Sequence, residues 1–251
     1  PMTTMAEYEE AVANGDTIND QGGPTMPTDR SETARPTPYY EDGQVAIYHG
    51  DCREIMPALD QVDAVLTDLP YGIGLDYGVE FDDTQEYLAA LVAEALPMML
   101  DKAPVVALTC GIDNWWRYPA PKWVLCWYMS NACASTGRWG FNQWQPVLVY
   151  GTDPYLKRQR GRRPDVVITA APNTGADKRL GHPCPKPTEA WAKVLLRVSP
   201  DESDVILDPF MGSGTTLVTA KYSGRKAIGI DIDERFCEIA AKRLGQEVLA
   251  L

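Results

Sequence analysis

The sequence predicts a doubly wound α/β fold, in which helices cover both faces of a mostly parallel β-sheet. Three short apolar stretches support this prediction: residues 62–66, 204–207 and 226–230 are typical of buried strands, and each runs into a polar turn. A helical segment separates the second strand from the third, as in a parallel sheet. Because ligands of such sheets bind at the carboxyl ends of the strands, we expect the functional residues in these turns.

The other elements follow in chain order. Apolar, β-branched and aromatic runs predict strands at 44–48, 104–109, 122–129 and 142–150. Apolar residues at helical spacing predict a long helix at 84–100, and further helices are expected from residue 53 and at 188–198, 217–223 and 234–244. Six of the seven tryptophans lie between residues 114 and 144. They could form a platform for stacked nucleobases, but core packing, with Trp123 and Trp127 in strand 122–129, is the favoured interpretation.

The first strand ends in the sequence DLPYG at residues 68–72. Pro70 and Gly72 force the chain out of regular strand pairing. The Asp68 carboxylate and the Leu69 carbonyl can each accept a hydrogen bond from an NH2 group, and Tyr71 offers a face for stacking. These groups suit a nucleobase that has been rotated out of its helix. An ordinary strand followed by a turn is the structural alternative.

The second strand ends in the sequence DPFMGSGTT at residues 208–216. Gly212 and Gly214 allow the backbone to approach a ligand closely, and the amino end of the next helix favours a carboxylate or phosphate. The turn lacks the Gly-Lys-Ser/Thr ending of a phosphate-binding loop, so a nucleoside triphosphate is disfavoured. Asp231 ends the third strand about 20 residues after the glycines, an arrangement that binds ribose hydroxyls in nucleoside-binding folds.

These motifs resemble those of the amino-methylating DNA methyltransferases that use S-adenosylmethionine. DLPY at 68–71 is similar to their catalytic D/N/S-P-P-Y signature, 208–216 is nearly their DPFxGSGTT loop, and HPCPKP at 182–187 resembles their HPxxKP element. The catalytic motif precedes the cofactor loop, which is the circularly permuted order of the β class. The resemblance covers roughly residues 44–245 and implies a Rossmann-like fold with a seven-stranded, mostly parallel sheet.

The resemblance implies a site-specific enzyme, of the kind found in restriction-modification, that methylates the exocyclic N6 amine of adenine in DNA. Aspartate at position 68 favours adenine, and the N4 amine of cytosine is the alternative. Hydrogen bonds from the amine to Asp68 and to the Leu69 carbonyl would free the nitrogen lone pair for in-line attack, so no covalent enzyme intermediate is needed. The expected catalytic residues are Asp68, Leu69, Pro70 and Tyr71. Leu69 stands where the family more commonly has proline, but its contribution is a backbone carbonyl.

The same resemblance implies the binding site for S-adenosylmethionine. Asp51 would lie near the adenine amine of the cofactor, and capping of the following helix is an equally good interpretation of this residue. His182 and Lys186 are expected at the methionine end. The full expected set is Asp51, His182, Lys186, Asp208, Phe210, Gly212, Ser213, Gly214, Thr215, Thr216 and Asp231.

Composition divides the chain into two parts. Residues 1–43 are expected to be a mostly flexible acidic leader with one helical candidate at 6–14, and the start at Pro1 indicates a trimmed chain. Nine acids and two bases there account for seven of the twelve net negative charges, so the remaining chain opposes DNA binding much less. Residues 44–251 are the expected methyltransferase domain, divided into a catalytic half (44–151), a target-recognition insert (152–181) and a cofactor-binding half (182–251).

The segment KRQRGRR at residues 157–163 concentrates five cations in seven residues. We expect phosphate contacts from Lys157, Arg158, Arg160, Arg162 and Arg163 on double-stranded DNA whose target base is flipped out. A solvated, flexible face is the structural alternative. The insert is short for a recognition domain, which favours a short target site, a homodimer, or help from the glycine-rich loop at 72–83.

Other classes of protein agree less well with the same residues. Related sites methylate amines of RNA or protein, but those families usually place the cofactor loop first. A non-catalytic partner would not need an intact Asp68 and Tyr71, a nicotinamide dehydrogenase would need a full GxGxxG, and a cysteine nucleophile would need a Pro-Cys pair after the catalytic strand. Six scattered cysteines and two histidines predict no metal site. Without a membrane-length apolar run or a signal peptide, we expect a cytoplasmic protein with reduced thiols.

Overall fold

The computed structural model describes residues 36–72, 83–130, 136–137, 140–170 and 186–246. The strands of its main sheet are β1 (Tyr40–Glu41), β2 (Val45–His49), β3 (Ala64–Asp68), β4 (Val105–Thr109), β5 (Trp123–Met129), β8 (Trp144–Gly151), β9 (Val166–Thr169), β10 (Val205–Asp208) and β11 (Lys226–Asp231). A separate two-stranded sheet consists of β6 (Thr136–Gly137) and β7 (Gly140–Phe141). The helices are α2 (Cys52–Ile55), η1 (Met56–Ala58), α3 (Gln85–Lys102), η2 (Trp115–Arg117), α4 (Pro154–Lys157), α6 (Thr188–Val198), α7 (Thr215–Tyr222) and α8 (Glu234–Gln246).

The strands of the main sheet are in the order β1-β2-β11-β10-β3-β4-β8-β5-β9. β2, β11, β10, β3 and β4 run parallel to one another, whereas β8 runs antiparallel to both β4 and β5. The seven strands from β2 to β5 form the predicted doubly wound sheet, and β1 and β9 extend it at its two edges. The predicted fold class is therefore confirmed, with two strands more than the seven expected.

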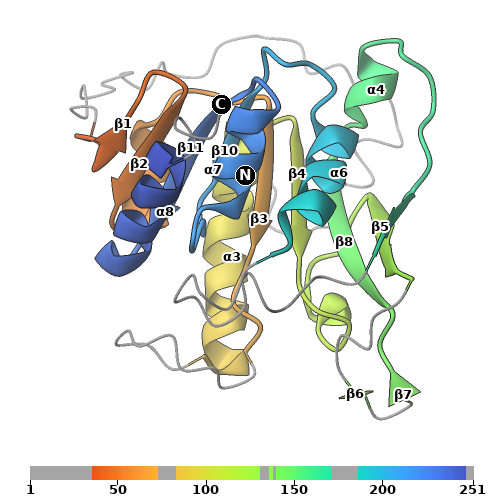
Figure 1. Ribbon diagram of the computed structural model, residues 1–251. Helices are drawn as coiled ribbons and strands as arrows, with labels where there is room; N and C mark the ends of the chain where they lie inside the picture. The colour runs from red at the N-terminus through yellow and green to blue at the C-terminus, as the bar shows by residue number, and fades with distance from the viewer. Residues whose placement is uncertain (1–35, 73–82, 131–135, 138–139, 171–185, 247–251) are drawn as a thin grey trace, which may run out of the picture. The chain divides into compact units, whose positions relative to one another are not determined.

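Helices cover both faces of the sheet, as Figure 1 shows. α6, α7 and α8 lie on one face, where Trp191 and Leu217 belong to the first hydrophobic core. α2, η1 and α3 lie on the other face, and Leu91 and Met99 belong to the second core. In a sheet of this kind, ligands bind at the carboxyl ends of the parallel strands.

Some element boundaries differ from the sequence prediction for local reasons. β3 begins at Ala64 and includes Asp68, so the catalytic motif starts inside the strand. α3 begins at Gln85 because Thr84 caps it, accepting a hydrogen bond from the Tyr87 amide at 3.1 Å. Within the predicted recognition insert, α4 and β9 are regular elements that the sequence reading did not predict.

Two predicted segments lie mostly outside the described residues, namely the leader with its helical candidate at 6–14 and the loop at 72–83. The last part of the predicted leader is described, and there β1 pairs with β2. The Tyr39 amide also donates a hydrogen bond to the Ile47 carbonyl at 2.7 Å. The sheet therefore begins before residue 44, the predicted start of the domain.

The aromatic strand β5 alternates between buried and accessible residues. Trp127 is 2% exposed, its ring centroid lies 6.4 Å from that of Trp191, and its Nε1 donates to Thr169 Oγ1 at 2.9 Å. Trp123, at the start of the strand, is 60% exposed. Core packing is thus correct for Trp127 and wrong for Trp123.

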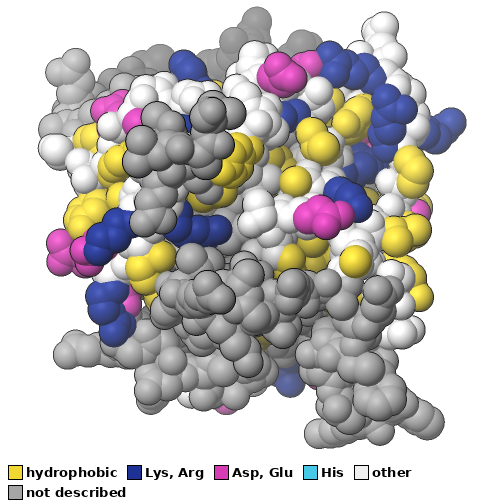
Figure 2. Space-filling model, viewed as in Figure 1, with side chains coloured by type: hydrophobic (Ala, Val, Ile, Leu, Met, Phe, Trp, Pro, Cys, Tyr) yellow, Lys and Arg dark blue, Asp and Glu magenta, His cyan; other side chains and the backbone are white. Residues whose placement is uncertain are grey.

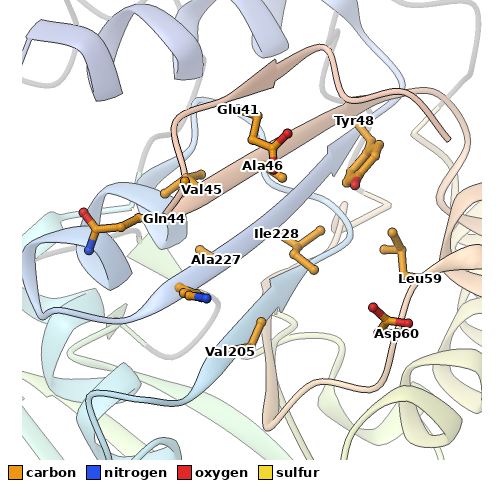
Figure 3. Close-up of a pocket in the computed structure, with 12 residues that line it drawn as sticks. Glu41, Gln44, Val45, Ala46, Tyr48, Leu59, Asp60, Val205, Ala227 and Ile228 are labelled. Carbon is orange, nitrogen blue, oxygen red and sulfur yellow. The ribbon is translucent and has the colours of Figure 1, made fainter. Parts of the chain in front are cut away.

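A cavity of about 200 Å³ lies beside the first residues of β2, β10 and β11 (Figure 3). Tyr48, Asp60 and Ile228 are among its lining residues. The parallel strands begin at the edge of the sheet opposite to the motif-bearing turns, so this cavity is separate from the predicted site.

No helix among the described residues is long and apolar enough to cross a membrane. The same part of the chain contains no group of three or more His, Cys, Asp or Glu side chains that could hold a metal ion.

Candidate active site

Asp68 is the centre of a hydrogen-bonded cluster at the carboxyl end of β3. Its Oδ1 accepts hydrogen bonds from Tyr71 Oη at 2.8 Å and from Thr109 Oγ1, and its Oδ2 accepts one from Lys186 Nζ. Thr109 ends the neighbouring parallel strand β4, where it pairs in register with Asp68. The Asp68 side chain remains 25% exposed. Two fixed hydroxyls therefore orient one carboxylate oxygen, while the other faces a long, flexible cation.

Lys186 and Tyr71 form the second part of this cluster. Lys186 Nζ donates to Tyr71 Oη at 3.0 Å and lies 5.1 Å from the centroid of the Tyr71 ring. Burial, with a further contribution from the Asp68 charge, raises the pKa of Tyr71 far above its ordinary value. Tyr71 is therefore a neutral phenol that donates its proton to Asp68. The predicted contact of Lys186 with the cofactor stays a prediction, and in the structure its ammonium lies on the Asp68 carboxylate.

The backbone after Asp68 is held by side chains from other elements. Asn114 Nδ2 donates to the Tyr71 carbonyl at 2.5 Å, and Gln85 Nε2 donates to the Gly72 carbonyl at 2.6 Å. The Gly72 amide donates to Asp83 Oδ1 at 2.7 Å. We call residues 68–72 the catalytic corner. Its conformation depends on residues distant in sequence from the motif, and this is why the sequence reading missed them.

Gly72 and Leu69 show why the corner has its particular residues. Gly72 has a φ of 64°, and a Cβ there would lie 2.9 Å from Gln85 Nε2. The Leu69 side chain is buried in the second core. The departure from the family's proline thus adds a core contact, while Pro70 follows as in the family motif.

The turn after β10, residues 208–216, is called the cofactor turn. Asp208 is buried, and its carboxylate accepts hydrogen bonds from Thr67 Oγ1 at 2.6 Å, Thr216 Oγ1 at 2.5 Å and the Phe210 amide at 3.1 Å. Thr216 Oγ1 in turn accepts one from Trp191 Nε1 at 2.7 Å. Burial raises the pKa of Asp208 to about 6. The hydrogen bonds of Asp208 and Thr216 therefore stabilise the conformation of the turn.

Close packing fixes the glycines of the cofactor turn. Gly214 has a φ of 77°, and a Cβ there would lie 2.7 Å from the Ala240 Cβ of α8. Arg243, also on α8, donates from Nη1 to the Ser213 carbonyl at 2.6 Å and lies 3.3 Å from Thr215 Oγ1. α8 thus holds the turn by a packing contact and by hydrogen bonds, and we call this arrangement the clasp of α8. Arg243 was not predicted as a site residue, and the Lys-Arg-Leu ending of its helix, at residues 242–244, is the sequence signal that could have indicated it.

Asp231 and Asp51 lie beyond the cofactor turn at the ends of neighbouring strands. Asp231 accepts hydrogen bonds from the Gly212 amide at 2.8 Å and the Asp233 amide at 2.9 Å, and burial raises its pKa to about 7. Asp51 caps α2, accepting from the Arg53 amide at 2.8 Å, and hydrogen bonding to Arg53 lowers its pKa. The capping interpretation of Asp51 is therefore correct, and a cofactor contact remains compatible with it.

The predicted cofactor residues divide into two groups. Asp208, Ser213, Thr215 and Thr216 are buried and serve the turn itself. Phe210, Gly212, Asp231 and Asp51 are partly accessible and can meet a ligand. His182 lies outside the described residues. The accessible donors and acceptors, next to glycines that admit close approach, fit a nucleoside with an anionic tail.

The five cations at 157–163 do not form a uniform surface. Arg158 forms a bidentate pair with Asp204 at 2.9 and 2.8 Å and also contacts Asp201, which Arg160 contacts as well. Lys157, Arg162 and Arg163 are exposed, and Figure 2 shows basic side chains gathered around α4. Asp204 directly precedes β10, so this part of the segment lies at the edge opposite to the catalytic corner.

The fold and its two strand-end motifs define a Rossmann-like methyltransferase. The chain belongs to the DNA methylase family, whose N6_N4_Mtase model matches residues 115–242. The predicted relationship to amino-methylating DNA methyltransferases is confirmed.

Individual relatives support the same assignment. The chain is 27% identical over 275 residues to the type II methyltransferase M.ScaI of Streptomyces caespitosus, covering 85% of this chain and 86% of that protein. It is 43% identical over 68 residues to the DNA adenine methyltransferase YhdJ of Escherichia coli, 27% of this chain and 23% of that protein.

Solved structures show the same fold. The M1.HpyAVI-SAM complex matches with a TM-score of 0.59 and 23% identity, over 80% of this chain and 98% of that chain. The cytosine-N4-specific PvuII DNA methyltransferase matches with a TM-score of 0.62 and 16% identity, over 83% of this chain and 89% of that chain.

Proposed function

We propose that this protein transfers a methyl group from S-adenosylmethionine to the exocyclic N6 amine of adenine in DNA. The observation that carries the proposal is the Asp68 carboxylate at the end of β3, one strand away from the cofactor turn of β10. Membership of the DNA methylase family supplies the reaction class. Aspartate at position 68 and the similarity to the adenine methyltransferase YhdJ favour adenine.

The chain's own residues would activate and orient the amine. Fixed hydroxyl donors occupy Asp68 Oδ1, so the target amine would bind at Oδ2 and take over the position of Lys186 Nζ. A hydrogen bond to Asp68 pulls the nitrogen towards tetrahedral geometry and frees its lone pair for attack. The Leu69 carbonyl would accept a hydrogen bond from the second N–H of the amine. The proton that the nitrogen loses on alkylation can be held by Asp68.

The cofactor, when bound, supplies an electrophilic methyl group on a sulfonium. Asp231 would accept hydrogen bonds from its ribose hydroxyls, because each carboxylate oxygen already bonded to a backbone amide still has a free lone pair. Gly212 would let the backbone approach the ligand, Phe210 would line the same site, and Asp51 would meet the adenine amine. His182 completes the proposed set from outside the described residues.

The DNA part of the proposal is double-stranded DNA with the target base rotated out of the stack. Lys157, Arg162 and Arg163 are exposed, and we propose that they contact phosphate away from the target base, because their segment follows β8 at the edge opposite to the catalytic corner. Arg158 and Arg160 are assigned instead to ion pairs within the protein. A homodimer would extend the short recognition insert.

The test is nucleoside mass spectrometry on unmethylated DNA incubated with the protein and methyl-labelled S-adenosylmethionine. We expect label in N6-methyladenine, and loss of that label with Asp68→Ala while cofactor binding persists. Label in N4-methylcytosine would keep the mechanism and overturn the target base. No label in any DNA, despite measured cofactor binding, would overturn the proposed substrate.

A further inference from the structure

We propose that the turn η2, formed by Trp115, Trp116 and Arg117, contacts DNA beside the target base and that Trp116 stacks on a nucleobase there. This inference rests on the proposed function, because it requires a DNA duplex over the edge of the sheet that holds Asp68. It adds an interaction surface that neither of the two sequence motifs contains.

The aromatic side chains of η2 point into solvent. Trp116 is 64% exposed and Trp115 is 39% exposed, while Tyr118 is buried and anchors the turn from below. Arg117 and Asp113 are both exposed on the same short segment, so their charges offset each other. The turn therefore presents aromatic rings, and no net charge, to a partner.

The turn is attached directly to the catalytic corner. Asn114 is buried, and its side chain donates to the Tyr71 carbonyl at 2.5 Å. The Arg117 amide donates back to the Asn114 carbonyl at 2.8 Å, which closes the turn. One residue thus links the catalytic corner to the turn that carries the exposed tryptophans, which puts the turn on the same edge of the sheet as Asp68.

DNA is the partner that fits this position. Rotating a base out of the helix costs a few kcal/mol of stacking and pairing, and an aromatic ring that stacks on a neighbouring base offsets part of that cost. Stacking on aromatic side chains is tolerant of sequence because every base has a π-face. The other partner that an exposed aromatic pair could take is a second copy of the chain, and the experiment separates the two.

Trp123 provides a matched control. It is 60% exposed, close to the value for Trp116, but it lies at the amino end of β5 and its Nε1 donates to Asp165 Oδ2 at 3.1 Å. The two tryptophans therefore differ mainly in their position relative to the catalytic corner.

The experiment measures binding of a fluorescein-labelled duplex of mixed sequence by anisotropy, together with methyl transfer to the same DNA. We expect Trp116→Ala to weaken DNA binding about tenfold, since base–aromatic stacking contributes about 1–3 kcal/mol. Trp116→Phe should restore most of the affinity, and Trp123→Ala should leave it unchanged. All three variants should bind S-adenosylmethionine as the parent protein does.

Three results would overturn the inference. Trp116→Ala could bind DNA as tightly as the parent protein, or Trp116→Ala and Trp123→Ala could lose affinity equally. Alternatively, Trp116→Ala could convert a dimer into a monomer in sedimentation while DNA affinity is unchanged, which would assign η2 to a protein interface. If the parent protein methylates DNA, such results concern η2 alone, whereas a parent protein that methylates no DNA contradicts the proposed function itself.

Discussion

The catalytic corner and the cofactor turn both follow a parallel strand, but they are stabilised in different ways. The cofactor turn is fixed by close packing and by buried hydroxyls, with Gly214 against Ala240 leaving no room for one more methyl group. The catalytic corner is held by hydrogen bonds from side chains on separate elements, and Asp68 remains partly exposed. A turn that holds a constant cofactor can be rigid, whereas a corner that receives a base must exchange one hydrogen-bond donor for another.

The largest effect is expected where packing is tightest. Gly214→Ala places a methyl group 2.7 Å from the Ala240 Cβ in a left-handed conformation, and we expect it to lower the free energy of unfolding by about 3 kcal/mol. Gly224→Ala is the control, because Gly224 has the same φ of 77° but its nearest neighbour is 3.6 Å away. Thermal unfolding measures both. Equal losses in the two variants would show that backbone strain, and not packing, limits the turn.

Lys186 tests the idea that the corner exchanges donors. Lys186→Met removes the cation that faces Asp68, and we expect kcat to fall about 30-fold, as when one partner of a half-buried ion pair is lost. Lys186→Arg should recover part of the rate. A Lys186→Met protein with weaker cofactor affinity and normal kcat would return Lys186 to the cofactor site.

A smaller effect is expected from the hydroxyl that orients Asp68. Thr109→Val keeps the shape of a fully buried side chain and removes its hydrogen bond to Oδ1, so we expect kcat to fall about tenfold. Thr219→Val is the matched control, since the buried Thr219 hydroxyl has no hydrogen-bond partner and its loss should leave activity and stability unchanged. Steady-state kinetics measures kcat for both variants. An equal fall in kcat would show that Thr109 does not orient Asp68.

The smallest effect concerns pH and the cofactor site. Burial raises the pKa of Asp231 to about 7, so the carboxylate that accepts hydrogen bonds forms as pH rises through that value. Affinity for S-adenosylmethionine should therefore increase about threefold between pH 6 and pH 8, the contribution of one modest hydrogen bond. Calorimetric titrations across this range should show the rise in the parent protein and a flat profile in Asp231→Asn. A rise that persists in the variant would place the titrating group elsewhere.

The sequence predicted the site residues that lie within the motifs, but not those that reach the site from other strands and helices. The strand, the glycines at 212 and 214, and the acid at 231 are set by backbone conformation and spacing, and the structure places them together as expected. Thr109, Gln85 and Asn114 reach the site from other elements, and nothing in their own neighbourhoods indicates this. Their contribution depends on strand register and helix orientation, which a motif does not specify.

The cationic segment shows a second difference. Its concentration of charge predicts phosphate contacts, and the structure pairs Arg158 with Asp204 and Arg160 with Asp201. The acids that pair with them lie about 40 residues later in the chain, so a count of charges within the segment could not separate structural arginines from exposed ones.

The clasp of α8 on the cofactor turn also has a consequence for synthesis of the protein. A ribosome makes the catalytic corner early, but Ala240 and Arg243 emerge more than 150 residues later. Until they do, the turn lacks the helix against which Gly214 packs, so a growing chain that already contains Asp68 has no finished place for its cofactor. The place where the cofactor turn is completed is therefore finished only after α8 has been synthesised.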